Sequence, residues 1–276
     1  MLEMPEAAAV AQQVNQILKG KRVAKVIAGQ SPHKFAWYHG DPQEYCRLLA
    51  GRHVGDAESF GGMVEIRAEG AVMVFCDGAA IRYHREKDAR PLKHQLLVEF
   101  DDSSAFSVSV QMYGGLWCFK EREFENPYYQ TAKDKPSPLT GAFDGEYFNR
   151  MLTASGVEEL SAKALLATGQ RIPGLGNGVL QDILFSAGIH PKKKVKTFTE
   201  EEKDALFHAV KSTLREMTRQ GGRDTEKDLF GCPGGYKTRL CRNTSGQPCY
   251  VCGSLIKKEA YLGGSIYFCP GCQKVG

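Results

Sequence analysis

Two closely spaced cysteine pairs near the end of the chain constrain the fold more than any other feature. Cys249 and Cys252 form one C-x2-C pair, and after sixteen residues Cys269 and Cys272 form a second. Pairs at this spacing bring four thiolates to one tetrahedral ion, and zinc suits an all-thiolate site without redox chemistry. We therefore expect one structural Zn²⁺ ion in a ribbon over residues 249–276, with iron as the lesser alternative. Because four cysteines leave no open coordination position, we expect no catalytic metal.

The composition indicates a globular protein of the cytoplasm. The chain has 276 residues, of which 42% are hydrophobic and 25% charged, enough for two domains with cores and a small module. It contains no run of 18 apolar residues, so we expect no membrane contact, and it lacks the opening segments of a signal peptide. Nine cysteines in such a chain favour metal binding and free thiols over disulfides. We expect a cytoplasmic location, at the nucleoid if the source is bacterial.

The basic residues are concentrated in the second half of the chain. Residues 1–140 carry 17 Lys and Arg against 18 Asp and Glu, whereas residues 141–276 carry 19 against 14. This surplus gives mild support for a polyanionic partner at the C-terminal half.

The first 132 residues predict a β domain that is opened by one helix. Pro5 suits the first position of a helix, and Gly20 ends the helix-forming run that follows. Short alternating or β-branched segments come next and are separated by Gly and Asp turns. The expected strands cover residues 23–28, 64–68, 72–76, 96–100, 106–110 and 116–119. We therefore expect an antiparallel sandwich or barrel over residues 1–132.

The pattern changes to helical after a proline-containing linker over residues 133–143. A helical domain is expected over residues 144–248, and Thr197 or Thr199 suits the cap of its last helix. The expected helices cover residues 147–155, 157–167, 178–187 and 200–219. Residues 221–236 are rich in glycine and charge and predict a mobile loop. The fold class is therefore α+β, with several domains.

A turn rich in proline and glycine precedes the third expected helix. Residues 172–177 read Ile-Pro-Gly-Leu-Gly-Asn, and Gly188 and Pro191 end the helix that follows. The two glycines let the backbone come close to a ligand, and Asn177 lies where amide groups of a helix end point outward. Such a turn suits a phosphate group. Taken alone, it is better explained as an ordinary corner between two helices in a core.

Together these features resemble the formamidopyrimidine-DNA glycosylase and endonuclease VIII family. The resemblance covers the whole chain. It rests on the β domain with an acidic tip, the segments PGLGN at 173–177 and ILFSAGIHP at 183–191, and the four-cysteine ribbon. Supporting matches are EMPE at 3–6, Lys93 with His94, KPSPL at 135–139, Lys163, Gly235 with Tyr236, and GQPC at 246–249. The PGLGN turn and the four-cysteine ribbon are each specific for this family. Their occurrence in this order along one chain is more specific still.

The resemblance implies a DNA-repair protein that holds damaged double-stranded DNA in a cleft between its two main domains and turns a damaged base out of the stack. Asn177 and Lys163 would contact phosphates around that nucleotide, and the ribbon hairpin would contact the backbone nearby. Loop 221–236 would close over the base. The other matched residues expected at the DNA are His94, Gly176 and Tyr236. We expect a monomer without a nucleotide cofactor.

The chain departs from the family at the groups that perform its lyase chemistry. The family nucleophile is a proline amine that is exposed by removal of the initiator methionine, and Leu2 stands at that position. Because leucine is too large for efficient removal of Met1, the chain is expected to begin with the primary amine of Met1, one residue further out. The nucleophile therefore stays open between water and this N-terminal amine. The hairpin lysine of the family aligns with Gly61 and Gly62, and the arginine of the ribbon hairpin aligns with Gly264.

Two further positions align with the family's gap-filling residues. Gln111 and Tyr113 stand where the family has an arginine and a phenylalanine that fill the space left by the flipped base. Tyr113 is therefore expected to wedge into the stack, and Gln111 to contact the orphaned base. The alternative for Tyr113 is an aromatic residue packed on a strand, and for Gln111 a solvated strand residue.

Glu3 is retained, and it suits the chemistry that remains. Cleavage of an N-glycosidic bond passes through an oxocarbenium-like state, which a carboxylate can stabilise while it activates water. We therefore predict a monofunctional, water-using DNA N-glycosylase with little AP-lyase activity, with Glu3 as its base. Glu6 is a lesser candidate, because a carboxylate in the first turn of a helix also favours the helix dipole.

Two other functions are compatible with the sequence. The first is a non-catalytic protein that binds damaged or abasic DNA, which the number of lost catalytic groups favours. The second is a zinc-ribbon interaction module without a DNA role, which would make the Asn177 turn a coincidence. The lesion stays open between oxidised purines, ring-opened purines and oxidised pyrimidines.

Overall fold

The computed structural model describes residues 1–274, which form two compact units. Unit 1 contains Met1–Lys133 together with Gln220–Gly235, and unit 2 contains Asp134–Arg219 together with the residues from Tyr236 onward. Loop 221–236, which the sequence pattern groups with the helical domain, thus has all but its last residue in unit 1. The final two residues of the predicted ribbon, 275 and 276, lie outside the described residues.

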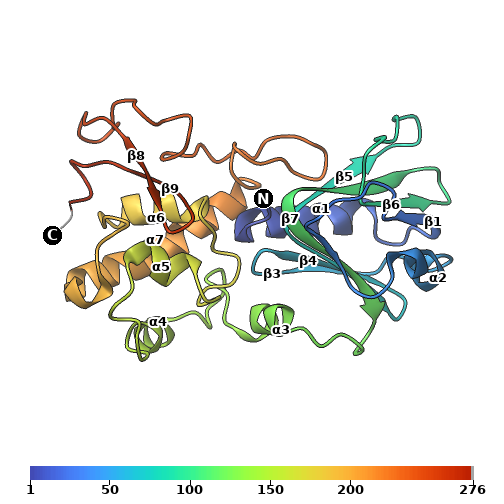
Figure 1. The fold of residues 1–276 in the computed structure, drawn as a ribbon, viewed down its shortest axis with the longest axis horizontal. Helices are drawn as coiled ribbons and strands as arrows, with labels where there is room; N and C mark the ends of the chain where they lie inside the picture. The colour runs from blue at the N-terminus through green and yellow to red at the C-terminus, as the bar shows by residue number, and fades with distance from the viewer. Residues whose placement is uncertain (275–276) are drawn as a thin grey trace. The chain divides into compact units, whose positions relative to one another are not determined.

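Unit 1 consists of a seven-stranded sheet and a long N-terminal helix (Figure 1). Its strands are β1 (Val23–Ala28), β2 (Ala36–Tyr38), β3 (Ala57–Phe60), β4 (Met63–Ala68), β5 (Ala71–His84), β6 (Leu96–Phe100) and β7 (Ala105–Lys120). Its helices are α1 (Met4–Ile17), the 3-10 helix η1 (Pro42–Glu44), α2 (Tyr45–Leu49) and α3 (Pro127–Asp134), which ends at the first residue of unit 2. The strand order is β1-β6-β7-β5-β4-β3, and β2 pairs parallel to β7.

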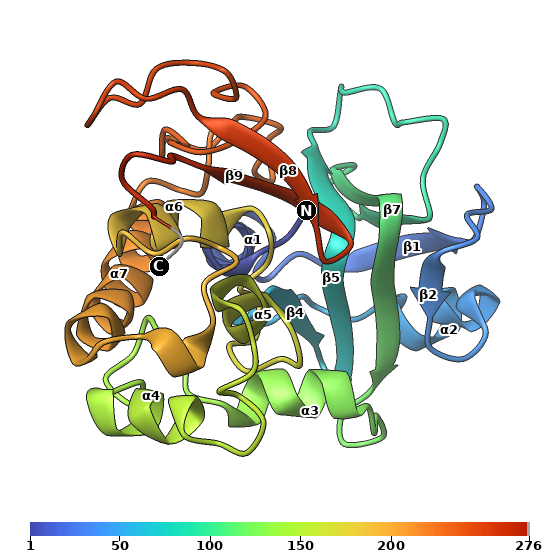
Figure 2. The same ribbon diagram turned by 60° about the vertical axis from the view of Figure 1, so that its left-hand side comes forward.

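The long strands β5 and β7 run side by side and belong to both layers of a β-sandwich (Figure 2). Residues 71–77 of β5 pair with residues 114–120 of β7, whereas residues 79–84 pair with residues 105–110. The first half of β5 also pairs with β4, and the first half of β7 pairs with β6. The pairing shifts at Gly78, opposite residues 111–113 of β7. Since strands change layers at such bulges, we call residues 77–79 and 111–113 the corner of the sandwich.

One face of α1 covers the core of unit 1. Ala7, Val10, Ala11 and Val14 have the spacing of a single helical face, and all four are buried in one apolar cluster with residues of the sandwich. The observed helix confirms the expected one. Just before the helix, the N–H of Leu2 donates to the carbonyl of Asp77 at 2.6 Å, so α1 begins at the corner.

The strands agree with the sequence pattern where they are short and differ where they bend. β1 and β6 have the predicted bounds, and β4 is one residue longer. The expected strand 72–76 is only the first half of β5, and the two strands expected at 106–110 and 116–119 are one strand, β7, because the corner bends the chain without ending the strand. Alternation of apolar residues did not identify the short elements β2, β3, α2 and α3.

Unit 2 is mostly helical and contains one two-stranded sheet. Its helices are α4 (Gly145–Leu152), α5 (Ala162–Ala167), α6 (Val179–Ser186), the 3-10 helix η2 (Val195–Thr197) and α7 (Glu200–Arg219), and its strands are β8 (Lys257–Tyr261) and β9 (Gly264–Phe268). The four main helices lie within or close to the predicted segments. None of the helices in the described part of the chain is long and apolar enough to span a membrane.

Side-chain caps set where the helices of unit 2 begin. The Ser161 hydroxyl accepts the N–H of Ala164, and α5 therefore starts at Ala162, five residues later than predicted. Thr199 is confirmed as the cap of α7. Its hydroxyl accepts the N–H of Glu202, and the Glu202 carboxylate accepts the N–H of Thr199, which is a capping box.

A substitution at Gly78 tests the packing of the corner. A Cβ atom on Gly78 would lie 2.5 Å from the carbonyl oxygen of Tyr113, so one of the two strands must move. We expect Gly78→Ala to lower the free energy of unfolding by about 2 kcal/mol, as overpacking does. As a control, Gly145→Ala adds the same methyl group at an open position and should change stability by less than about 1 kcal/mol. Urea titrations followed by circular dichroism measure both values, and equal losses would contradict the prediction.

Candidate functional site

Arg223 is buried between two carboxylates from the start of the chain. Its side chain is 2% exposed, and its Nη2 and Nε atoms lie 2.9 and 3.0 Å from the carboxylate oxygens of Glu6. Its Nη1 atom lies 3.6 Å from Oε1 of Glu3. Burial acts to lower the pKa of Arg223, but the Glu3 and Glu6 carboxylates outweigh burial and raise it, so the guanidinium stays charged. We call Glu3, Glu6 and Arg223 the buried ion cluster.

The loop that carries Arg223 is anchored in unit 1, which differs from the mobile loop expected. The N–H of Arg223 donates to Oε1 of Glu6, and Leu229 is buried in the apolar cluster beneath the loop. The side chain of Gln13 on α1 donates to the Asp228 carboxylate at 2.8 Å and accepts the N–H of Leu229 at 3.0 Å. The composition correctly predicts a segment without helix. It did not reveal the anchors at Glu6 and Gln13, because they lie at least 215 residues away in sequence.

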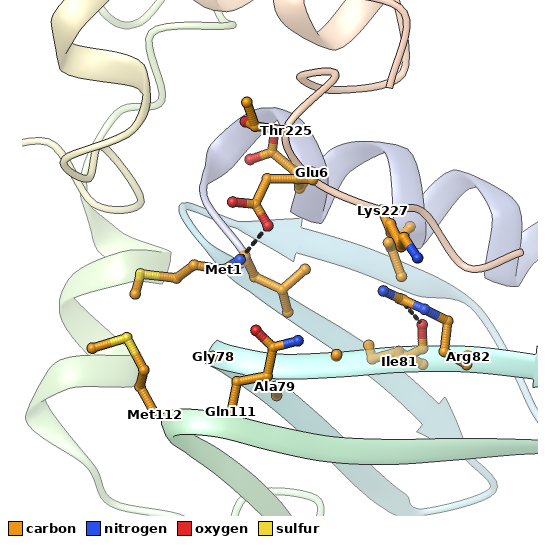
Figure 3. Close-up of a pocket in the computed structure, with 14 residues that line it drawn as sticks. Met1, Glu6, Gly78, Ala79, Ile81, Arg82, Gln111, Met112, Thr225 and Lys227 are labelled. Carbon is orange, nitrogen blue, oxygen red and sulfur yellow. Dashed lines mark hydrogen bonds and ion pairs between the residues drawn. The ribbon is translucent and has the colours of Figure 1, made fainter. Parts of the chain in front are cut away.

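A pocket of about 460 Å³ opens beside the buried ion cluster (Figure 3). Such a volume is within the range of roughly 300–1,000 Å³ for small-molecule sites. Glu6 lines the pocket, whereas Glu3 contacts Arg223 without being part of the lining. The other lining residues are Met1, Leu2 and Val10, residues 78–82 of β5, Gln111 and Met112 of β7, and residues 225–227 of the loop. Little of the pocket is filled by side chains of β5, because Gly78 has no side chain and Ala79 and Ala80 each have only a methyl group.

Arg82 and Lys227 are the cationic side chains of this pocket. The Nη1 atom of Arg82 donates to the carbonyls of Ile81 and Asp228, at 2.6 and 2.9 Å, and burial lowers the pKa of its guanidinium. Sequence reasoning missed Arg82, because nothing in a strand pattern shows that a residue faces a pocket. The lysine-free Gly61 and Gly62 form a two-residue turn between Phe60 and Met63, as expected for a hairpin. They do not line the pocket.

Three consecutive residues of β7 are presented outward at the corner. Gln111 and Met112 come from β7 towards Met1, as Figure 3 shows, and Met112 is 63% exposed. The ring of Tyr113 lies 5.6 Å from that of Trp37, measured between centroids. The sequence alignment pointed to Gln111 and Tyr113 but not to Met112. An apolar side chain this exposed is a candidate for contact with another molecule.

In unit 2, Lys163 and Asn177 meet at the turn of the β8–β9 hairpin. The Nζ atom of Lys163 donates to the carbonyl of Tyr261 at 2.6 Å, and the Nδ2 atom of Asn177 donates to that of Ser265 at 2.9 Å. A Cβ atom on Gly264 would lie 3.4 Å from Nζ of Lys163 and 3.7 Å from Cγ of Asn177. The two predicted phosphate contacts and the hairpin turn therefore form one polar cluster, although they are far apart in sequence.

Gln181 fixes this cluster in position. Its Nε2 atom donates to the carbonyl of Asn177 at 2.9 Å, and its Oε1 atom accepts the N–H of Tyr267 on β9 at 3.1 Å. One buried amide on α6 thus joins the turn to the hairpin. Burial lowers the pKa of Lys163.

The remaining residues expected at the DNA have different environments. Gly176 lies in the turn before α6, and its carbonyl accepts the N–H of Leu180. Tyr236 is buried, and its hydroxyl bonds to the buried carboxyl of Asp182. His94 is also buried; its Nδ1 donates to the carbonyl of Pro91, and its Nε2 has no partner among residues 1–274. These contacts give Tyr236 and His94 structural roles, and DNA contact by either stays a prediction.

The four cysteines of the predicted ribbon converge in unit 2. Their Sγ atoms all lie within 4.8 Å of one another. The Sγ atoms of Cys249 and Cys272 are 3.8 Å apart, and those of Cys252 and Cys269 are 3.3 Å apart. Sulfur atoms around a tetrahedral zinc ion, with bonds of about 2.3 Å, are separated by about 3.8 Å. The cluster therefore has the chemistry and the size to hold one metal ion.

This chain is similar to known proteins over nearly its whole length. A family model described as the formamidopyrimidine-DNA glycosylase H2TH domain matches residues 135–228. The formamidopyrimidine-DNA glycosylase of Bacillus licheniformis is 28% identical, over 99% of this chain and 100% of its own length. The enzyme of the same name from Prochlorococcus marinus is 30% identical, over 68% of this chain and 66% of its own.

Solved structures show the same fold. MutM (Fpg) from Thermus thermophilus matches with a TM-score of 0.82 and 22% identity, over 99% of each chain. Lactococcus lactis Fpg, in a complex with DNA that contains an abasic site, matches with a TM-score of 0.84 and 19% identity, again over 99% of each chain. The fold thus contains an N-terminal β-sandwich, a helical domain and a C-terminal cysteine cluster.

Breaking the buried ion cluster is expected to destabilise unit 1. Arg223→Met removes the cation that contacts both Glu3 and Glu6 and leaves two buried carboxylates, at a cost of about 3–5 kcal/mol in the free energy of unfolding. The control is Arg219→Met, which breaks an exposed pair with Glu216 and should leave the free energy of unfolding almost unchanged. Urea titration compares the two, and a similar loss in both would show that the cluster contributes little stability.

Proposed function

The chain belongs to the formamidopyrimidine-DNA glycosylase family, and on that ground we propose that it removes damaged bases from duplex DNA by hydrolysis. The protein would bind the damaged duplex, turn the damaged base out of the stack and cut its N-glycosidic bond. The observation that carries this proposal is the 460 Å³ pocket in unit 1, which is lined by the carboxylates of Glu6 and Glu226 and has no lysine among its β5 residues. We assign the flipped base to this pocket.

The carboxylates of the buried ion cluster suit hydrolysis. As the glycosidic bond breaks, positive charge develops on the sugar, and a fixed negative group nearby stabilises it. Glu3 is our candidate base, which would take a proton from water as the water oxygen bonds to the sugar carbon. The N-glycosidic bond breaks in the same reaction, and the departing base keeps its electron pair and takes a proton from solvent. Glu6 makes two short bonds to the Arg223 side chain and one to its backbone, so its main role is to hold the loop that walls the pocket.

The surroundings of Leu2 argue against lyase chemistry. Its side chain is buried in the core of unit 1, and its backbone nitrogen is an amide whose hydrogen is bonded to Asp77. The amide nitrogen of Leu2 cannot form the Schiff base that an exposed proline amine forms. Met1 lines the pocket, and its primary amine is the N-terminal amine that could do so, but it is paired with the Glu226 carboxylate. Since Gly61 and Gly62 also lack the second cation, we propose base removal that leaves the strand intact.

The polar cluster of unit 2 is proposed to bind the DNA backbone. Lys163 and Asn177 both have further N–H groups beyond those bonded to the hairpin, and these can donate to phosphate oxygens. At the corner of the sandwich, Gln111, Met112 and Tyr113 would fill the space that the flipped base leaves. The sequence predicts this gap-filling role for Gln111 and Tyr113, and we add Met112 to them.

The cysteine cluster is proposed to hold one structural zinc ion. Zinc bound there would link the two ends of the β8–β9 hairpin and supply no chemistry to the reaction. The cluster is joined to the helices by Gln273, which accepts the N–H of Cys269 and donates to the carbonyl of Ile189. We further propose a monomer in the cytoplasm that uses no nucleotide cofactor.

A second function is supported by one observation. Glu3 does not line the pocket and is paired with Arg223, so it could serve stability alone. The protein would then bind damaged or abasic DNA without cutting the glycosidic bond. Activity measurements on Glu3 variants separate the two functions.

The glycosylase proposal is tested with end-labelled duplexes that each contain one lesion, among them a ring-opened purine, an oxidised purine and an oxidised pyrimidine. We expect strand breaks only after hot alkali, because the base is removed and the backbone left whole. Glu3→Gln should lower the rate by about 100-fold or more, the usual contribution of a general base, with unchanged duplex binding. Denaturing gels with and without alkali measure both products.

The matched control is Glu86→Gln, which makes the same change on an exposed residue of unit 1 and should leave the rate unchanged. Breaks without alkali at the same rate would contradict the hydrolytic mechanism. Tight binding of damaged duplexes without any breaks would favour the non-catalytic function.

Metal analysis tests the ribbon. We expect about one zinc ion per chain and a loss of most of it in Cys272→Ser, because three thiolates hold the ion less tightly than four. Cys241→Ser, outside the cluster, is the control and should keep its zinc. The zinc-free variant should also bind DNA more weakly, because the hairpin positions Lys163 and Asn177. Zinc-free wild-type protein with full DNA affinity would contradict this role.

A further inference from the structure

The corner of the sandwich separates two pockets of unit 1. Gly78 lines the 460 Å³ pocket described above, whereas its neighbour Asp77 lines a second pocket of about 570 Å³. On the facing strand, Gln111 and Met112 line the first pocket and Tyr113 lines the second. Two consecutive residues of β5 and three of β7 therefore divide one surface into two adjacent cavities.

Aromatic side chains form the walls of the second pocket. Trp37, Tyr113 and Tyr128 line it and remain 46%, 36% and 39% exposed, and the more buried Trp117 lies beside them. The rings of Trp37 and Tyr113 are tilted by 32°. Three large rings exposed around one opening leave apolar surface uncovered, which in a soluble protein marks a site for a planar or apolar ligand.

Asp77 gives this aromatic pocket one acidic group. Its carboxylate accepts the hydroxyl of Tyr128 at 3.1 Å and the thiol of Cys76 at 3.3 Å, and among residues 1–274 no cation contributes to its titration. Burial raises its pKa. Its backbone has a φ of +58°, which few residues other than glycine adopt. The corner thus holds an uncompensated acid in an unfavourable conformation, as functional residues often are.

The aromatic rings and the Asp77 carboxyl group are suited to binding a nucleobase. Aromatic rings stack on any base, and a carboxyl group accepts a hydrogen bond from an exocyclic amino group. An alkylammonium ion would also suit aromatic walls, but it would rely on a full negative charge, which the half-buried Asp77 holds less readily than an exposed acid. A hydrogen-bonding base edge is compatible with both forms of the carboxyl.

We propose that the second pocket receives the base that is left unpaired opposite the damaged nucleotide. That base would stack on Trp37 and Tyr113 and donate an amino hydrogen to Asp77. The inference rests on the proposed function, because it requires an opened base pair. Each base of that pair would then have its own pocket, one on either side of the corner, and the protein would prefer partners that carry an amino group.

The two tryptophans of the chain make the pocket directly observable. Trp37 and Trp117 are its only tryptophans, and both line this pocket. The probes are duplexes with a tetrahydrofuran abasic analogue opposite guanine, hypoxanthine or a second tetrahydrofuran. Hypoxanthine is guanine without its amino group, and the double analogue has no base to offer. We expect guanine to quench the tryptophan emission and the double analogue to leave it nearly unchanged.

Affinity provides the second measurement. The guanine duplex should bind about tenfold more tightly than the hypoxanthine duplex, because a hydrogen bond to a carboxylate increases affinity by about this factor. Asp77→Gly removes the acceptor while glycine keeps the backbone conformation, so this ratio should fall to about one. Trp37→Leu should lower the affinity for the guanine duplex by about fivefold or more and leave the affinity for the double analogue unchanged. Asp101→Gly, at an exposed aspartate of the same unit, is the control and should keep the ratio.

Two results would overturn the inference. If all three abasic duplexes bind more tightly than undamaged DNA with equal affinity and equal emission, the pocket takes no partner base, while the proposed function stands. If tetramethylammonium quenches the emission and the guanine duplex does not displace it, the pocket is a cation site. Abasic duplexes that bind no better than undamaged DNA would overturn both proposals together.

Discussion

Arg223, buried between the carboxylates of Glu3 and Glu6, holds two segments of unit 1 together beside the pocket in which we expect the reaction. Arg223 and Glu6 are 217 residues apart, yet their three hydrogen bonds bring the loop and the first helix into contact. Burying charges is costly unless they are paired and hydrogen-bonded, and here the pairing is nearly complete. The pocket wall at residues 225–227 follows Arg223 directly, so its position depends on this contact.

The same region shows which chemistry unit 1 can support. Leu2 is part of the core, and the turn at Gly61 and Gly62 carries no lysine, so this chain lacks the two groups that the family's covalent step is expected to use. The carboxylates remain, held in fixed positions by a buried guanidinium. These carboxylates are the groups that the proposed hydrolytic step requires.

Local patterns predicted the ribbon, the first helix, the capped α7 and the Asn177 turn, because each is encoded within a few neighbouring residues. The sequence did not predict that β5 and β7 run through the corner, since glycines at a bend resemble glycines at a strand end. The start of α3 is also encoded locally, because the Asn126 side chain caps it and Pro127 occupies its first position. Arg223 and Arg82 could not be found from sequence, because their partners come from distant segments.

The environment of Lys163 has a consequence for how tightly unit 2 can hold a phosphate. A lysine on a surface loses considerable side-chain freedom when it binds a ligand. Lys163 has lost this freedom on folding, because its stem is buried and its Nζ is bonded to a hairpin carbonyl instead of a carboxylate. Among residues 1–274, Lys163 has no ion pair that would have to be broken before it meets an anion. If Lys163 binds phosphate as proposed, the entropy cost of ordering its side chain is met during folding and lowers the stability of the folded state, not the affinity for DNA.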